Sequence, residues 1–112
     1  MKKIFAIVLA LISFSAHAEL KSHKGKITGY IASEQGANKV FFFKLEGNPS
    51  GGCNTTSRFV VESTSPRYEG IQSAILASFH SKTEVNVYFH ETCNTGQNGF
   101  DSLWVCVGDI PC

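Results

Sequence analysis

This sequence of 112 residues lacks several patterns that would each point to a particular function. It has no run of basic residues, so a nucleic-acid partner has no electrostatic support. It has no C-x2-C pair of the kind that structural zinc sites use, and no G-x-S-x-G elbow of a serine hydrolase. No second long apolar run follows residue 12, so we expect no membrane insertion by the rest of the chain.

The start of the chain has the composition of a secretory signal peptide. Lys2 and Lys3 form a short basic segment, and residues 4–12 form an apolar run that is too short to span a membrane. Ala16 and Ala18 place small side chains where signal peptidase cuts. We therefore expect a signal peptide over residues 1–18 and a secreted or periplasmic protein. A membrane anchor is the alternative, which the shortness of the run disfavours.

The expected mature chain, residues 19–112, has the size of one small domain. Without Lys2 and Lys3 it carries eight basic and nine acidic side chains. Its net charge is therefore about −1 with neutral histidines, which again gives no reason to expect nucleic acid as a partner.

Four cysteines lie in the expected mature chain: Cys53, Cys93, Cys106 and Cys112. An even count in a short secreted chain is typical of disulfides, and four cysteines allow three pairings. Cys106 and Cys112 are separated by five residues that include Pro111, so a turn would bring them together. The spacing predicts a Cys106–Cys112 bond and, by elimination, a Cys53–Cys93 bond. Zinc binding is the alternative, which the wide spacings disfavour.

The pattern of apolar and polar residues predicts five strands, with a turn at residues 34–38 between the first two. Within the second strand, Phe41, Phe42 and Phe43 are consecutive, so at least one must point outward. Such a side chain would lie either under the chain's own loop or against a neighbouring subunit. The expected strands cover residues 24–33, 39–47, 57–63, 83–91 and 102–108.

One helix is expected between the third and fourth strands, over residues 65–79. Ser65 is a candidate N-cap, Pro66 suits the first turn, and Glu69 favours the positive end of the helix. An apolar stripe recurs at spacings of three and four residues: Tyr68, Ile71, Ile75 and Phe79.

The resulting order, β-β-β-α-β-β, predicts a mainly β fold with one helix. It is the order of an OB-fold-like five-stranded Greek-key barrel, in which the helix would cover the open end. A five-stranded meander with a packed helix is the alternative. OB-folds bind oligonucleotides and oligosaccharides, and the charge of this chain disfavours the oligonucleotides.

No group of residues suggests catalysis. His90 and Glu91 are neighbours on a strand and would point to opposite faces, so they would not converge. His80 lies near the end of the helix, where the helix dipole alone favours a histidine. If all cysteines are paired, no thiol nucleophile remains. We therefore expect no enzyme, no catalytic residue, no metal and no cofactor.

Several segments together resemble the B-subunit family of subtilase cytotoxin: the Ser65-Pro66 helix start, the polar link at residues 81–83, the V-x-V strand at residues 85–87 and the Cys106…Cys112 pair. The resemblance implies an OB-fold, a homopentameric ring, binding of sialylated cell-surface glycans and a toxic A subunit as a partner. The chain departs from the family in its other cysteine pair, because Cys93 follows the fourth strand.

We expect a shallow glycan site formed by the first two strands and their turn. Ser33, Glu34 and Gln35 would supply polar groups, while Tyr30 and Tyr88 would supply aromatic faces. A solvated turn without a ligand is the alternative. The expected function is that of a secreted, non-catalytic, glycan-binding subunit. The alternative is a periplasmic or secreted monomeric OB-fold binder of a small ligand or protein.

Overall fold

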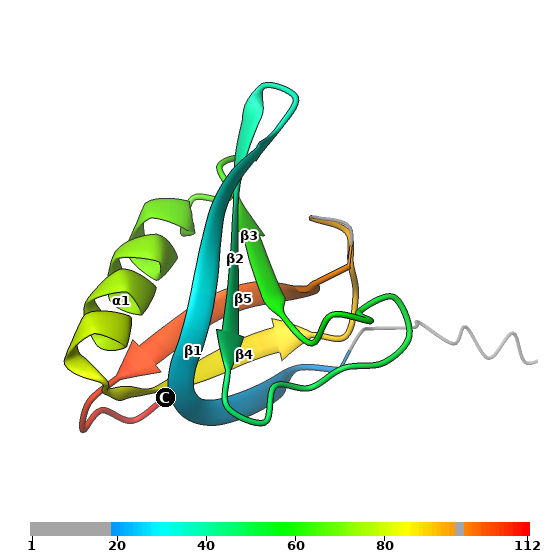
Figure 1. The fold of residues 1–112 in the computed structure, drawn as a ribbon. Coiled ribbons are helices and arrows are strands. Elements are labelled where there is room, and N and C mark those ends of the chain that lie inside the picture. Colours follow the sequence, from blue (N-terminus) through cyan, green and yellow to red (C-terminus); the bar gives the residue numbers. More distant parts are fainter. Residues whose placement is uncertain (1–18, 96–97) are drawn as a thin grey trace, which may run out of the picture.

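A computed structural model describes residues 19–95 and 98–112 of the protein, so the expected signal peptide lies outside the described residues (Figure 1). The order of the elements is the expected β-β-β-α-β-β. Strands and helix have these bounds: β1 Lys21–Gln35, β2 Asn38–Leu45, β3 Phe59–Glu62, α1 Tyr68–Ser81, β4 Glu84–His90 and β5 Phe100–Val107.

The five strands form one closed barrel in the order β1-β2-β3-β5-β4. Strand β3 pairs with β5 in parallel, whereas the other neighbours are antiparallel. A meander would place β4 beside β3, so the position of β5 between them excludes that alternative. The expected mainly β, five-stranded barrel with one helix is confirmed. Within the described ranges, no helix has the length and apolarity needed to cross a membrane.

Strand β1 belongs to both halves of the barrel, because its first part pairs with β4 and its second part with β2. It curves strongly between these parts (Figure 1). At Gly25 a Cβ atom would lie 3.1 Å from the carbonyl oxygen of Glu46, so a side chain there would crowd the backbone directly after β2.

The first residue of β1 forms an ion pair on the surface. The Lys21 ammonium lies 2.9 Å from the Glu91 carboxylate, and this hydrogen bond raises the pKa of Lys21. Both side chains are exposed, so the pair adds little stability.

A chain of aromatic rings fills the barrel. Phe43 packs on Phe59 with ring centroids 5.5 Å apart, and Phe59 packs on Phe89 at 4.9 Å. Phe41 packs on Phe43 at 6.0 Å and Phe100 packs on Phe89 at 5.8 Å, so these two rings form the ends of the aromatic row. These rings alternate with outward residues along their strands, as the period of two requires. The core is therefore continuous from β2 through β3 to β4 and β5.

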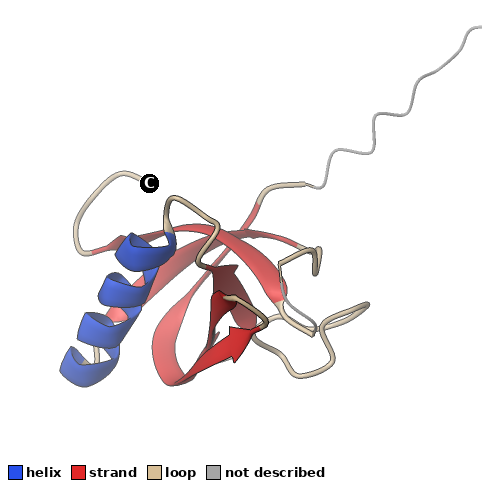
Figure 2. Ribbon diagram, turned by 90° about the horizontal axis from the view of Figure 1, so that it is seen from above, coloured by secondary structure: helices blue, strands red, loops and turns tan. Residues whose placement is uncertain are grey.

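Helix α1 lies at one side of the barrel (Figures 1 and 2). Its expected apolar stripe is confirmed, since Tyr68, Ile71 and Ile75 are buried and the partly buried Phe79 packs against the core. The helix ends at Ser81, followed by Lys82 in a left-handed conformation.

The start of the helix differs from the sequence prediction. Ser65 is not the N-cap, because the helix begins at Tyr68 and Arg67 takes the cap position without a side-chain hydrogen bond. The Ser65 hydroxyl instead accepts from the Arg67 N–H at 3.2 Å, and the Ser65 carbonyl accepts from the Tyr68 N–H at 3.1 Å. Serine bonds of this local kind stabilise a turn, and Pro66 lies within that turn.

Both predicted disulfides are confirmed. Cys53 and Cys93 have Cα atoms 6.1 Å apart, and Cys106 and Cys112 have Cα atoms 6.3 Å apart. The first bond joins the loop before β3 to the loop after β4, and the second joins the end of β5 to the C-terminal segment. With all four cysteines bonded to one another, the zinc alternative is excluded for them. Two disulfides indicate an oxidising, non-cytoplasmic compartment.

The two disulfides should contribute unequally to stability. Changing Cys53 and Cys93 together to serine should lower the free energy of unfolding by roughly 4 kcal/mol, because this bond closes a loop with a sequence separation of 40. Changing Cys106 and Cys112 to serine should cost only about 2 kcal/mol, since the separation is 6. Urea unfolding of both variants measures the difference. A larger loss for the terminal pair would contradict this ordering.

Candidate ligand-binding groove

The outer face of β2 carries an aromatic ring that the core does not use. Phe41 and Phe43 are fully buried in the core, and Phe42 between them points to the other face and is partly buried. The guanidinium carbon of Arg58 lies 3.9 Å from the centroid of the Phe42 ring. The prediction that one of the three rings points outward is therefore confirmed. The Phe42 ring is covered by the Arg58 side chain of the same molecule.

Arg58 is held in place by its own backbone, directly before β3. Its N–H donates to the Asn54 side-chain oxygen at 3.2 Å. Its carbonyl accepts from the Asn54 side-chain nitrogen at 3.0 Å and from the Phe100 N–H at 3.0 Å. Asn54 is fully buried, so these bonds are shielded from water. Hydrogen bonds to Asn54 and to Phe100 therefore fix the backbone from which the Arg58 side chain extends.

Asn98, in a left-handed conformation, fixes the far end of the arginine. Its carbonyl accepts from Arg58 Nε at 2.9 Å and from the Thr56 hydroxyl at 2.8 Å. Its side-chain oxygen accepts from the N–H groups of Thr55 and Thr56 at 2.6 and 3.1 Å. One asparagine therefore joins the loop before β3 to the loop before β5, close in sequence to the Cys53–Cys93 bond.

Asp101 organises the loop that contains Cys93. Its carboxylate accepts hydrogen bonds from the Thr92 hydroxyl, from the Asn94 N–H at 3.0 Å and from the Thr95 N–H at 2.8 Å. The residue is buried within β5. A buried carboxylate with three donors is well satisfied, so its role here is structural.

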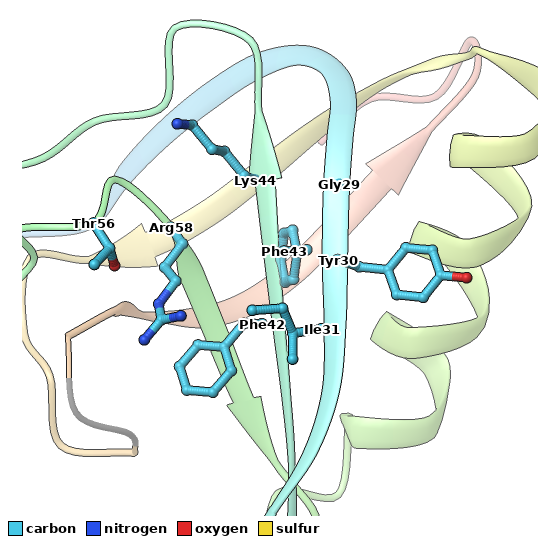
Figure 3. Close-up of a pocket in the computed structure, with 8 residues that line it drawn as sticks. All are labelled: Gly29, Tyr30, Ile31, Phe42, Phe43, Lys44, Thr56 and Arg58. Atoms are coloured by element: carbon cyan, nitrogen blue, oxygen red, sulfur yellow. The ribbon is translucent and has the colours of Figure 1, made fainter.

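Ile31, Phe42 and Arg58 line a shallow groove on this face of the barrel, which we call the Phe42 groove. Its larger part has a volume of about 330 Å³ and is shown in Figure 3. A smaller part of about 200 Å³ adjoins it at Phe42 and Arg58. The larger part is lined by Gly29, Tyr30, Ile31, Phe42, Phe43, Lys44, Thr56 and Arg58, and the smaller by Ser33, Glu34, Gln35, Val40, Phe42 and Arg58.

The structure brings four of the five predicted site residues to the groove, on strand β1 and not on a loop, and Tyr30 lines its larger part. Ser33, Glu34 and Gln35 line its smaller part. Glu34 and Gln35 are paired with β2 as the last residues of β1, so the turn shrinks to Gly36 and Ala37. The predicted five-residue turn at 34–38 was therefore too long.

The two predicted tyrosines do not turn their rings into the groove. The Tyr30 ring points toward the helix, where it packs on Phe41 at 5.6 Å and on Phe79 at 5.5 Å (Figure 3). Tyr30 and Ser33 are an odd number of residues apart on one strand, so their side chains point to opposite faces. Tyr88 stacks on Trp104 at 4.9 Å, on β4 and β5.

Several residues that line the groove were not predicted as site residues, among them Ile31, Phe42, Lys44 and Arg58. Alternation would have placed Ile31 on the face of Ser33, and Lys44 on the face of Phe42. Arg58 had no such pattern, because its position depends on hydrogen bonds to Asn54 and Asn98.

A second hollow, of about 500 Å³, lies on the helix side of the β1–β2 hairpin, and its lining includes Glu34, Lys39 and Gln72. Glu34 and Lys39 are exposed there, so neither has the fixed geometry of Arg58. We therefore take the Phe42 groove as the candidate site.

His90 and Glu91 are neighbours in sequence at the end of β4. His90 contacts the carbonyl of Glu19 at 3.2 Å through Nδ1, whereas Glu91 pairs with Lys21. The two side chains therefore have separate partners, and Glu91 lies just beyond the end of β4. Among residues 19–95 and 98–112, no cluster of three or more histidine, cysteine, aspartate or glutamate side chains could hold a metal ion.

Comparison with known proteins adds nothing to this geometry, because no family model, no curated protein and no solved structure matches the chain.

Asp101→Ala should loosen the loop after β4, because three donors would lose their acceptor. We expect the free energy of unfolding to fall by about 2–4 kcal/mol. The Asn94 and Thr95 amides should also lose protection from hydrogen exchange. Asp109→Ala is the control, since Asp109 is exposed and its loss should change stability by less than about 0.5 kcal/mol. Full protection of both amides in Asp101→Ala would contradict the role of the carboxylate.

Proposed function

We propose that the protein is a secreted, non-catalytic binding subunit that recognises glycans through the Phe42 groove. The observation that carries the proposal is the combination of an apolar floor and fixed polar groups. Ile31, 49% exposed, and Phe42 supply apolar surface, while Arg58 is held by hydrogen bonds beside them. Ligand sites of this type are mostly apolar, with a few placed polar groups that set orientation.

A sugar ring suits this arrangement because it has both kinds of surface. Its C–H face would lie on Ile31 and Phe42, and its hydroxyl groups would face Ser33 and Gln35 in the smaller part of the groove. The groove is shallow, so a single site should bind weakly. The strand order is compatible with the OB-fold, whose strands and adjoining loops bind oligosaccharides. The resemblance to the subtilase cytotoxin B subunit supports sialylated glycans as the ligand class.

The same resemblance supports a homopentamer with a toxic A subunit as its partner. Helix α1 exposes the small side chains Ser73 and Ala77 opposite its buried stripe, and the uncharged Gln72 lies half-buried at the edge of that stripe. Such a face would let helices of neighbouring subunits approach closely around a central axis. A ring would place several weak sites on one surface, and the avidity could then exceed the single-site affinity by roughly a hundredfold.

Glycan-array binding tests the ligand. Ile31→Ala should reduce binding about tenfold, because it removes an exposed apolar side chain from the floor of the groove. Ile110→Ala is the matched control, since Ile110 is also an exposed isoleucine but does not line the groove. A blank array at high protein concentration would reject glycan binding. Equal losses in both variants would place the site elsewhere.

Light scattering of the mature protein at micromolar concentration tests the assembly. We expect a mass five times that of the single chain, with one head-to-tail interface repeated until the ring closes. A clean monomer would reject the ring. That result would favour the alternative function, a periplasmic or secreted monomeric binder of a small ligand or protein.

A further inference from the structure

Arg58 is a cation without a carboxylate partner in the described part of the chain. The ion pairs found there are Lys21–Glu91 and Lys24–Glu84, and no carboxylate lies within 4.0 Å of the Arg58 side chain. The residues outside the description, 1–18, 96 and 97, contain no aspartate or glutamate that could pair with it. An arginine is always charged at neutral pH, so this positive charge is available to a ligand.

Two acidic residues lie in or beside the groove, and neither forms an ion pair with Arg58. Glu62 accepts a hydrogen bond from the Asn38 side chain at 2.6 Å. Glu34 lines the smaller part of the groove together with Arg58, but no ion pair joins them. Lys44 lines the larger part, so that part carries two positive charges and no negative one.

The guanidinium is also held in one orientation. Its Nε donates to the Asn98 carbonyl at 2.9 Å, and its flat face lies on Phe42. Among the described residues, no acceptor bonds the two Nη atoms of Arg58. Phe42 shields one face of the guanidinium from water, and this lower local dielectric strengthens the attraction between the guanidinium and an anion at its Nη atoms. A fixed planar fork of this kind fits two oxygens of one oxyanion.

We infer that Arg58 binds an oxyanion of the ligand, either a carboxylate or a sulfate ester, with the two Nη atoms as donors. This inference rests on the proposed glycan function and assigns the side chain that would recognise the acidic group of the sugar. The ligand is an acidic or sulfated saccharide, and a neutral one lacks the group that Arg58 recognises.

The test uses one oligosaccharide in three forms: neutral, carrying a sialic acid carboxylate, and carrying a sulfate ester. The wild-type protein should bind an anionic form at least about tenfold more tightly than the neutral form. The preferred form identifies the source of the oxyanion. Equal affinity for all three forms would overturn the inference while leaving glycan binding intact.

Three variants assign the preference to Arg58. Arg58→Gln should abolish it, and Arg58→Lys should retain only part of it, because lysine keeps the charge but lacks the planar fork. Arg67→Gln is the matched control, since Arg67 also lies over an aromatic ring, at 5.9 Å from Trp104, but outside the groove. Circular dichroism and thermal unfolding establish that each variant is folded. An undiminished preference in folded Arg58→Gln or Arg58→Lys would overturn the assignment.

Inorganic sulfate provides a test that does not depend on glycan binding. Titration of the wild-type protein with sulfate should shift the NMR signal of the Arg58 Nε–H saturably, and a chloride titration at equal ionic strength should not. If the glycan array is blank but sulfate saturates, the proposed function fails and the oxyanion site stands. If sulfate causes no saturable shift, the inference fails whatever the array shows.

Discussion

The barrel closes through a strand of only four residues, β3, and one side chain of that strand connects the two halves of the core. Phe59 is fully buried and packs on Phe43 from β2 and on Phe89 from β4. Its backbone pairs with Phe100 at the parallel junction of β3 and β5. So short a strand contributes few backbone hydrogen bonds. The contact between these aromatic rings therefore determines how the β1–β2 hairpin sits against β4 and β5.

The candidate site depends on the same junction. Because successive residues of a strand point to opposite faces, the burial of Phe59 turns its neighbour Arg58 outward, above Phe42. The carbonyl of Arg58 then accepts from the Phe100 N–H, and Asn98 lies close enough to receive Nε. Core packing and the orientation of the cation are thus two results of one strand pairing. A change that displaces Phe59 would displace the groove as well.

The parts of the structure that could be predicted from sequence depend on local patterns or on spacing. The apolar stripe of α1 and the short turn between Cys106 and Cys112 are of this kind. The helix start was placed too early, because Ser65 can stabilise either a helix end or a turn and only the tertiary structure selects the turn. Arg58 could not be assigned at all, since its orientation depends on Asn98, which lies forty residues later in the chain.

The Cys53–Cys93 bond links the stability of the groove to that of the barrel. Both cysteines lie in loops outside the strands, a few residues before the residues whose contacts orient Arg58, and Cys93 also packs against the aromatic core. A reducing environment would therefore loosen the loops that position the cation and lower the stability of the barrel at the same time. The redox state of the surroundings thus becomes a determinant of how long a ligand held by Arg58 stays bound.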